Sequence, residues 1–131
     1  MECSLKTLNN KIKILIVDDE PDILDLMADE FKYRGYSVNI ALSGGEAIEV
    51  LKKDTFDIIL SDYKMPNGNG MTLLNYVNSL SIRPLFFFVS GQSDMSINDC
   101  LSAGAKDFFA KPFDLEIMIS EIEKFLNLAN S

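Results

Sequence analysis

The sequence predicts an α/β domain in which five parallel strands form one sheet and five helices cover both of its faces. Segments with strand composition and segments with helical periodicity alternate five times along the 131 residues. Such alternation is typical of parallel strands joined by right-handed helical crossovers. Several strand segments are apolar almost throughout, as strands buried on both faces of a sheet must be. We therefore expect a doubly wound (βα)5 domain.

Composition narrows the class of protein. The 131 residues, of which 47% are hydrophobic, suffice for one folded domain with a buried core. The longest unbroken apolar run, Leu85–Val89, is too short to cross a bilayer. Residues 1–10 lack the basic start and long apolar segment of a signal peptide. We expect a cytoplasmic protein without membrane contact, with a polar leader over residues 1–10 and one domain over residues 11–131.

Three further features exclude whole classes of site. The absence of histidine removes most zinc sites and any serine-histidine triad. The two cysteines, Cys3 and Cys100, suggest neither a disulfide nor a metal pair. The net charge of −8 argues against direct nucleic-acid binding, which needs clustered lysine and arginine.

The first strand and helix are predicted over residues 11–17 and 22–34. The strand begins by alternating and becomes wholly apolar, and it ends in three acids followed by Pro21, a residue favoured in the first turn of a helix. Gly35 marks the end of the helix. The apolar stripe that we expect to face the sheet is Ile23, Leu26, Met27 and Phe31.

The second and third units follow the same plan. Residues 36–41 alternate weakly and predict the second strand, and Ser43 with Glu46 forms a capping box that opens a helix through Lys53. Residues 56–61 predict the third strand, after which Asp62 stands at the strand end. A helix over residues 71–80 completes the third unit.

The last two units close the sheet. Residues 85–89 predict a fully buried strand that ends in Ser90-Gly91, and Ser93 or Asp94 is expected to cap a helix reaching about Ala103. Residues 107–110 predict a short fifth strand that ends at Lys111-Pro112. Asp114 caps the last helix, and its apolar stripe consists of Leu115, Met118, Ile119, Ile122, Phe125 and Leu126.

Polar groups gather where these strands end. A strand order of 2-1-3-4-5 sets the first strand beside the third, so Asp18 and Asp19 lie next to Asp62. Ser90 and Lys111 end the fourth and fifth strands. Each residue also has an ordinary interpretation, as a turn aspartate, a helix N-terminal charge, a loop serine or an exposed lysine. Because every strand end but one carries its own polar group, we favour a site.

The chemistry of this set points to a metal and a phosphoryl group. Three carboxylates in one crevice repel one another unless a cation lies among them. Their hard oxygen ligands suit Mg²⁺ or Mn²⁺ better than Zn²⁺. A carboxylate beside such an ion can attack phosphorus, while Ser90 donates a hydrogen bond and Lys111 supplies charge to phosphoryl oxygens. Gly91 leaves room for the group to enter.

Four short motifs carry a family resemblance: LIVDDE, IILSDYKMP, FFFVSGQ and FFAKPF. Together they resemble the receiver domain of response regulators in two-component signalling, the CheY-like family, over residues 11–128. The resemblance implies a flavodoxin-like fold of order 2-1-3-4-5. It also implies a phosphorelay signalling domain, not an enzyme, which assists its own phosphorylation and dephosphorylation.

The resemblance assigns roles in the crevice. Asp62 corresponds to the phosphoacceptor, which receives its group from a sensor histidine kinase or a histidine phosphotransfer protein. Asp19 and Asp62 would ligate Mg²⁺ directly, Asp18 through a bound water, and Lys64 through its backbone carbonyl. Ser90 and Lys111 would hold the phosphoryl oxygens.

The resemblance also implies a switch. Phe108 matches the switch aromatic, a position where tyrosine is also common, and the Lys111-Pro112 bond would be cis. Lys64 and Gln92 occupy positions that influence the phosphoryl lifetime. The surface of the fourth helix, fifth strand and last helix would then meet a protein partner or a second copy, as a monomer or a phosphorylation-dependent dimer. Candidates on that surface are Met95, Ile97, Leu101 and Lys106.

Other functions fit the sequence less well. A pseudo-receiver adaptor, which acts without phosphorylation, would be favoured by loss of the acidic pair or the lysine, and this chain keeps both. A Mg²⁺-dependent phosphatase would need an acid where Lys64 stands, and a flavin protein would need a Ser/Thr/Gly-rich loop in place of three acids. The chain ends at Ser131, soon after the last predicted helix. If it is the whole protein, we expect it to act through protein contacts. The alternative is a piece of a hybrid kinase or larger regulator.

Overall fold

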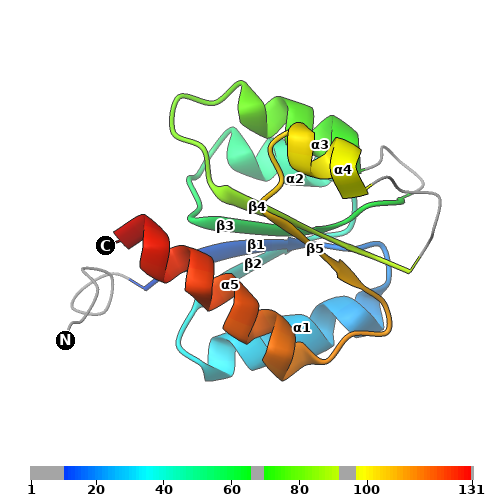
Figure 1. The fold of residues 1–131 in the computed structure, drawn as a ribbon, viewed down its shortest axis with the longest axis vertical. Coiled ribbons are helices and arrows are strands. Elements are labelled where there is room, and N and C mark those ends of the chain that lie inside the picture. The colour runs from blue at the N-terminus through cyan, green and yellow to red at the C-terminus, as the bar shows by residue number, and fades with distance from the viewer. Residues whose placement is uncertain (1–10, 66–69, 92–96, 131) are drawn as a thin grey trace.

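The predicted fold class is confirmed. The computed structural model describes residues 11–65, 70–91 and 97–130, and within them five parallel strands of order β2-β1-β3-β4-β5 alternate with helices (Figure 1). The predicted leader over residues 1–10 lies outside the described residues, as do Gln92, Met95 and the predicted caps Ser93 and Asp94.

The element bounds agree with the predicted ones to within a few residues. The strands are β1 (Lys13–Val17), β2 (Ser37–Ala41), β3 (Ile58–Asp62), β4 (Leu85–Ser90) and β5 (Asp107–Ala110). The helices are α1 (Pro21–Tyr33), α2 (Gly44–Leu51), α3 (Gly70–Asn78), α4 (Ile97–Ser102) and α5 (Leu115–Asn130).

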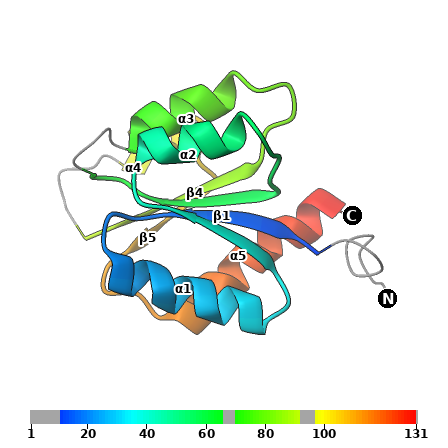
Figure 2. The ribbon, with the colours of Figure 1, turned by 180° about the vertical axis from the view of Figure 1, so that it is seen from behind.

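The sheet divides the core into two layers. Helices α1 and α5 cover one face, and α2, α3 and α4 cover the other (Figures 1 and 2). Neighbouring residues of one strand face opposite layers, because side chains alternate along a strand. In β1, for example, Leu15 and Val17 pack with the α2 side and Ile14 and Ile16 with the α1 side.

The predicted stripe of α1 was wrong in one position. Leu26 is 59% exposed, whereas Leu24, which was not included in that stripe, is 1% exposed. The buried residues of α1 are Leu24, Met27, Ala28 and Phe31. They are spaced three, four and seven residues from the first, which is the spacing of one helical face. The predicted stripe combined residues from two adjacent faces.

The register of the sheet positions the strand ends. Val17 of β1 pairs with Ser61 of β3, so the residues that follow them, Asp18 and Asp62, lie side by side. Asp62 stands at the end of the third strand, as predicted: it is the last residue of β3, one residue beyond the predicted bound of that strand, and it pairs with Val89. Its backbone is therefore part of the sheet.

The start of α3 packs closely against the end of β3. The Gly70 N–H donates to the Tyr63 carbonyl oxygen at 2.6 Å. A Cβ atom on Gly70 would lie 2.4 Å from the Phe88 ring and 2.7 Å from the Asp62 carbonyl oxygen, closer than packed atoms tolerate. Glycine at the start of α3 is thus required for this close approach.

Candidate functional site

The carboxyl ends of β1, β3, β4 and β5 surround one polar crevice. In an open parallel sheet, this edge is where ligands bind. The crevice has a volume of about 330 Å³ and is lined by Asp19, Glu20, Asp62, Lys64, Ser90, Gly91 and Lys111. The structure therefore brings the predicted site residues of four different strand ends together.

Three carboxylates form a compact cluster in this crevice. One oxygen from each of Asp18, Asp19 and Asp62 lies within 4.8 Å of the others. Asp18 is completely buried and Asp62 is 8% exposed. Buried carboxylates at this separation repel one another strongly. An all-oxygen donor set of this kind fits a hard divalent cation such as Mg²⁺.

The environment of the cluster changes the pKa of two of its members. Burial raises the pKa of Asp62 to about 6, helped by the negative charge of Asp18 and opposed by Lys111. Burial also raises the pKa of Asp18, although the Glu20 N–H and Lys111 partly compensate. The Glu20 N–H donates to Asp18 Oδ1 at 2.9 Å. Ionised oxygens are thus held together at an energetic cost that a bound cation would offset.

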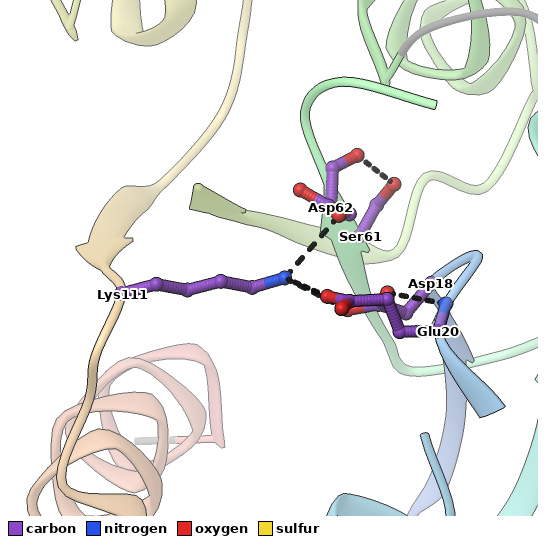
Figure 3. Close-up of polar contacts among 5 residues, drawn as sticks. All are labelled: Asp18, Glu20, Ser61, Asp62 and Lys111. Carbon is purple, nitrogen blue, oxygen red and sulfur yellow. Dashed lines mark hydrogen bonds and ion pairs between the residues drawn. The ribbon is translucent and has the colours of Figure 1, made fainter. Parts of the chain in front are cut away.

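Lys111 reaches across the crevice from the end of β5 (Figure 3). Its Nζ lies 3.2 Å from Asp18 Oδ2, 3.3 Å from Asp62 Oδ2 and 3.5 Å from Glu20 Oε1. Burial disfavours the charged ammonium, but the Asp62 and Asp18 carboxylates outweigh this effect and raise the pKa of Lys111. Lys111 thus places a positive charge between the carboxylates of the site.

The ends of β4 and β5 hold Lys111 and Ser90 next to each other. Ser90 pairs with Ala110 in the sheet, and the Lys111 N–H donates to the Ser90 carbonyl oxygen at 2.9 Å. Ser90 is 2% exposed, and the Lys111-Pro112 peptide bond is cis. A Cβ atom on Gly91 would lie 3.3 Å from Lys111 Cβ, so Gly91 also leaves space for the lysine side chain.

Three of the predicted residues, Asp18, Phe108 and Pro112, are not part of the crevice lining. Phe108 is half-buried and packs against the core cluster on the α2, α3 and α4 side of the sheet. Pro112, which follows Lys111 in the chain, is exposed. Lys64 is exposed at the rim of the crevice.

Sequence reasoning missed the contact made by Glu20. In the sequence, Glu20 is the third acid after the first predicted strand, where its charge also fits the N-terminus of a helix. One signal was available. The N-cap position before Pro21 favours serine, threonine, aspartate or asparagine, and glutamate is not among the preferred residues.

A family comparison matches most of the chain. The model of the response regulator receiver domain matches residues 14–123. Two relatives illustrate the range of lengths. Sporulation initiation phosphotransferase F of Bacillus subtilis (strain 168) is 33% identical over 121 residues, which cover 91% of this chain and 97% of that protein. The transcriptional regulatory protein TrcR of Mycobacterium tuberculosis is 32% identical over 116 residues, which cover 88% of this chain but 45% of TrcR. The chain thus spans about half the length of several relatives that it matches.

Solved structures agree with the sheet order. A response regulator receiver domain protein (CheY-like) from Methanospirillum hungatei JF-1 superposes with a TM-score of 0.83 at 30% identity, covering 90% of this chain and 95% of that one. The response regulator TrrA from Thermotoga maritima, solved in complex with Mg²⁺-BeF, gives a TM-score of 0.77 at 25% identity, covering 86% and 97%. In the part of this chain that the structure describes, no helix combines the length and the apolar character needed to span a membrane.

Proposed function

This chain belongs to the response regulator receiver family of two-component signalling, and from that premise we propose that it is a phosphorylation-controlled switch whose phosphoacceptor is Asp62. One observation carries the proposal. Asp18, Asp19 and Asp62 present oxygens within 4.8 Å of one another, and the Lys111 ammonium lies 3.3 Å from Asp62 Oδ2. Proteins of this family are signalling domains and not enzymes in the usual sense.

Asp62 is the nucleophile of the proposed reaction. A carboxylate oxygen of Asp62 attacks the phosphorus of a phosphohistidine, a P–O bond forms, and the P–N bond breaks. The electron pair of that bond returns to the imidazole nitrogen of the donor, which later takes a proton from solvent. The raised pKa of Asp62, about 6, still leaves the carboxylate mostly ionised at pH 7.5.

Asp18, Asp19, Asp62 and the Lys64 backbone carbonyl would hold Mg²⁺, or Mn²⁺, in the crevice. We assign Asp19 and Asp62 as direct ligands and Asp18 as a ligand through water. The bound ion supplies positive charge that offsets the charge of an incoming phosphoryl group. The clustered, mutually repelling carboxylates support this assignment, because Asp18 and Asp62 are buried and gain the most from a cation.

Lys111 and Ser90 would receive the phosphoryl oxygens. Lys111 already directs its ammonium at Asp62, and its long side chain can turn to a new partner. The Ser90 hydroxyl supplies a hydrogen-bond donor at the neighbouring strand end. Both residues are anchored by the same pairing of β4 with β5.

We propose that phosphorylation signals to a partner by changing one surface of the domain. A phosphoryl group adds about two negative charges, which would draw Ser90 and Phe108 inward and alter the face formed by α4, β5 and α5. Leu101, 42% exposed on α4, and Lys106 are candidates on that face. The donor would be a sensor histidine kinase or a histidine phosphotransfer protein in the cytoplasm. The receiver of the signal would be a protein partner or a second copy of the chain.

The test is phosphorylation by a small donor. The wild-type protein, Asp62→Asn and the exposed-acid control Asp25→Asn are incubated with acetyl phosphate or phosphoramidate and Mg²⁺, and intact masses are measured. We expect a phosphoryl adduct on the wild type and on Asp25→Asn, no adduct on Asp62→Asn, and loss of all adducts in EDTA. A wild-type protein that binds Mg²⁺ but gains no adduct would favour the pseudo-receiver adaptor instead.

A further inference from the structure

We propose that Glu20 is a positioning residue that holds the Lys111 ammonium in the unphosphorylated protein and thereby slows phosphoryl transfer, a role that rests on the proposed phosphoacceptor function of Asp62. Figure 3 shows the carboxylate of Glu20 beside that of Asp18, with the Lys111 Nζ facing both. The Nζ–Oε1 distance is 3.5 Å.

The backbone of Glu20 is held on both sides. Its N–H donates to Asp18 Oδ1 at 2.9 Å, and its carbonyl oxygen accepts from the Leu24 N–H at 3.0 Å. Only the side-chain torsions therefore decide where the carboxylate goes. Glu20 occupies the N-cap of α1, yet its side chain makes no capping hydrogen bond. Helix capping does not explain a glutamate here, whereas the contact with Lys111 does.

The contact competes with phosphoryl binding. An ammonium has three N–H donors, and three carboxylates lie within 3.5 Å of the Lys111 Nζ. A phosphoryl oxygen must therefore replace one of them. Asp18 and Asp62 belong to the proposed acceptor and metal site, and Glu20 does not. Its side chain is also the most exposed of the three, at 60%, so this contact is the one to be exchanged.

The expected effect is modest because the Glu20 carboxylate is exposed. Ion pairs of this kind change an equilibrium by about two- to fivefold. We expect Glu20→Gln, which removes the charge, and Glu20→Asp, which keeps the charge but shortens the side chain, to accelerate phosphorylation by about this factor. Aspartate is a favoured N-cap residue, so Glu20→Asp also preserves the start of α1.

The experiment measures two quantities for the wild type, Glu20→Gln, Glu20→Asp and the control Asp22→Asn. Asp22 is an exposed acid two residues away, so Asp22→Asn matches the charge change near the site. The first quantity is the rate of adduct formation with acetyl phosphate at saturating Mg²⁺. The second is the NMR chemical shift of the Lys111 side-chain Cε and Nζ in EDTA, which reports the contact without any phosphorylation.

We expect both Glu20 variants to be faster and to shift the Lys111 signals, with Asp22→Asn matching the wild type in both measurements. Equal rates for wild type and Glu20→Gln, or unchanged Lys111 signals, would overturn the inference and leave the proposed function standing. A faster Glu20→Gln beside an unchanged Glu20→Asp would show an effect of charge alone and would also overturn it. A wild type without adduct would overturn the proposed function, and the inference with it.

Discussion

Burial and neighbouring charges change the protonation equilibria of Asp62 and Lys111. Asp62 is nearly buried beside Asp18, and desolvation by burial, with repulsion from Asp18, raises its pKa to about 6. Lys111 offsets part of this repulsion through contacts of 3.2 and 3.3 Å with the two carboxylates. The residue types and their strand-end positions could be predicted from the sequence. The contact of Glu20 with Lys111 could not, because it depends on side-chain torsions that no spacing rule specifies.

The pKa of Asp62 predicts a pH-dependent gain in stability for Asp62→Asn. The folded pKa of Asp62, about 6, lies above the ordinary 3.8. Below pH 4 the carboxyl is neutral in both states and does not lower the free energy of unfolding. As the pH rises through 6 the carboxyl ionises in the folded protein, and this stability is lost. At pH 7.5 in EDTA, Asp62→Asn should therefore be more stable than the wild type, by up to about 3 kcal/mol at roughly 1.4 kcal/mol for each pH unit. The gain should disappear near pH 4.

Denaturant unfolding at pH 4 and pH 7.5 checks this prediction. The control Asp25→Asn removes an exposed carboxylate of α1 and should change stability little at either pH. Mg²⁺ should stabilise the wild type more than Asp62→Asn, since a ligand stabilises the form that binds it. An Asp62→Asn protein less stable than the wild type at pH 7.5 in EDTA would contradict the account.

At the scale of elements, the sequence predicts the bounds of strands and helices closely. It predicts less well which face of a helix packs against the sheet. β5 has the predicted bounds, Asp107–Ala110, because Gly104 and Pro112 bracket it. α1 was also located correctly, but its buried face contains Leu24 and not Leu26. Periodicity permits two overlapping stripes in this helix, and only packing against the sheet and α5 selects one of them.

The orientation of α1 gives a stability prediction. Leu24 is 1% exposed and Leu26 is 59% exposed. Leu24→Ala should lower the free energy of unfolding by about 2–4 kcal/mol, because it leaves a cavity in the core. Leu26→Ala should change it by less than about 0.5 kcal/mol. Urea unfolding of the two variants checks the prediction, and similar losses in both would contradict the described face of α1.

The start of α3 gives a second prediction at this scale. Gly70→Ala would place a Cβ atom against the Phe88 ring and the Asp62 carbonyl oxygen, and it should destabilise the protein by about 1–3 kcal/mol. Gly45→Ala is the matched control, because the nearest atom to its Cβ is Ser43 Oγ at 4.0 Å. It should leave stability unchanged or raise it slightly. Thermal unfolding that ranks Gly70→Ala at or above the wild type would refute the close approach.

At the scale of the whole molecule, the strand order turns separate motifs into one site. Alternating strands and helices predict a parallel sheet, but local periodicity cannot rank the orders that such a sheet can adopt. The order 2-1-3-4-5 places β1 beside β3, and it is this neighbourhood that brings Asp18 within reach of Asp62. The crevice lies at the carboxyl ends of the strands, and β5 connects it to the face that we propose as the output surface. Phe108 in β5 is three residues before Lys111, which follows β5 in the chain.

The most direct test of the proposed switch follows the backbone amide NMR signals while Mg²⁺ and beryllofluoride, a phosphoryl analogue, are added to the wild type and to Asp62→Asn. We expect signals near Asp62, Ser90 and Lys111 to shift in the wild type together with those of Phe108, Leu101 and Lys106, and neither set to shift comparably in Asp62→Asn. Shifts confined to the crevice would contradict a switch of the α4, β5 and α5 face. A wild type with no shifts at all would contradict Asp62 as the phosphoacceptor.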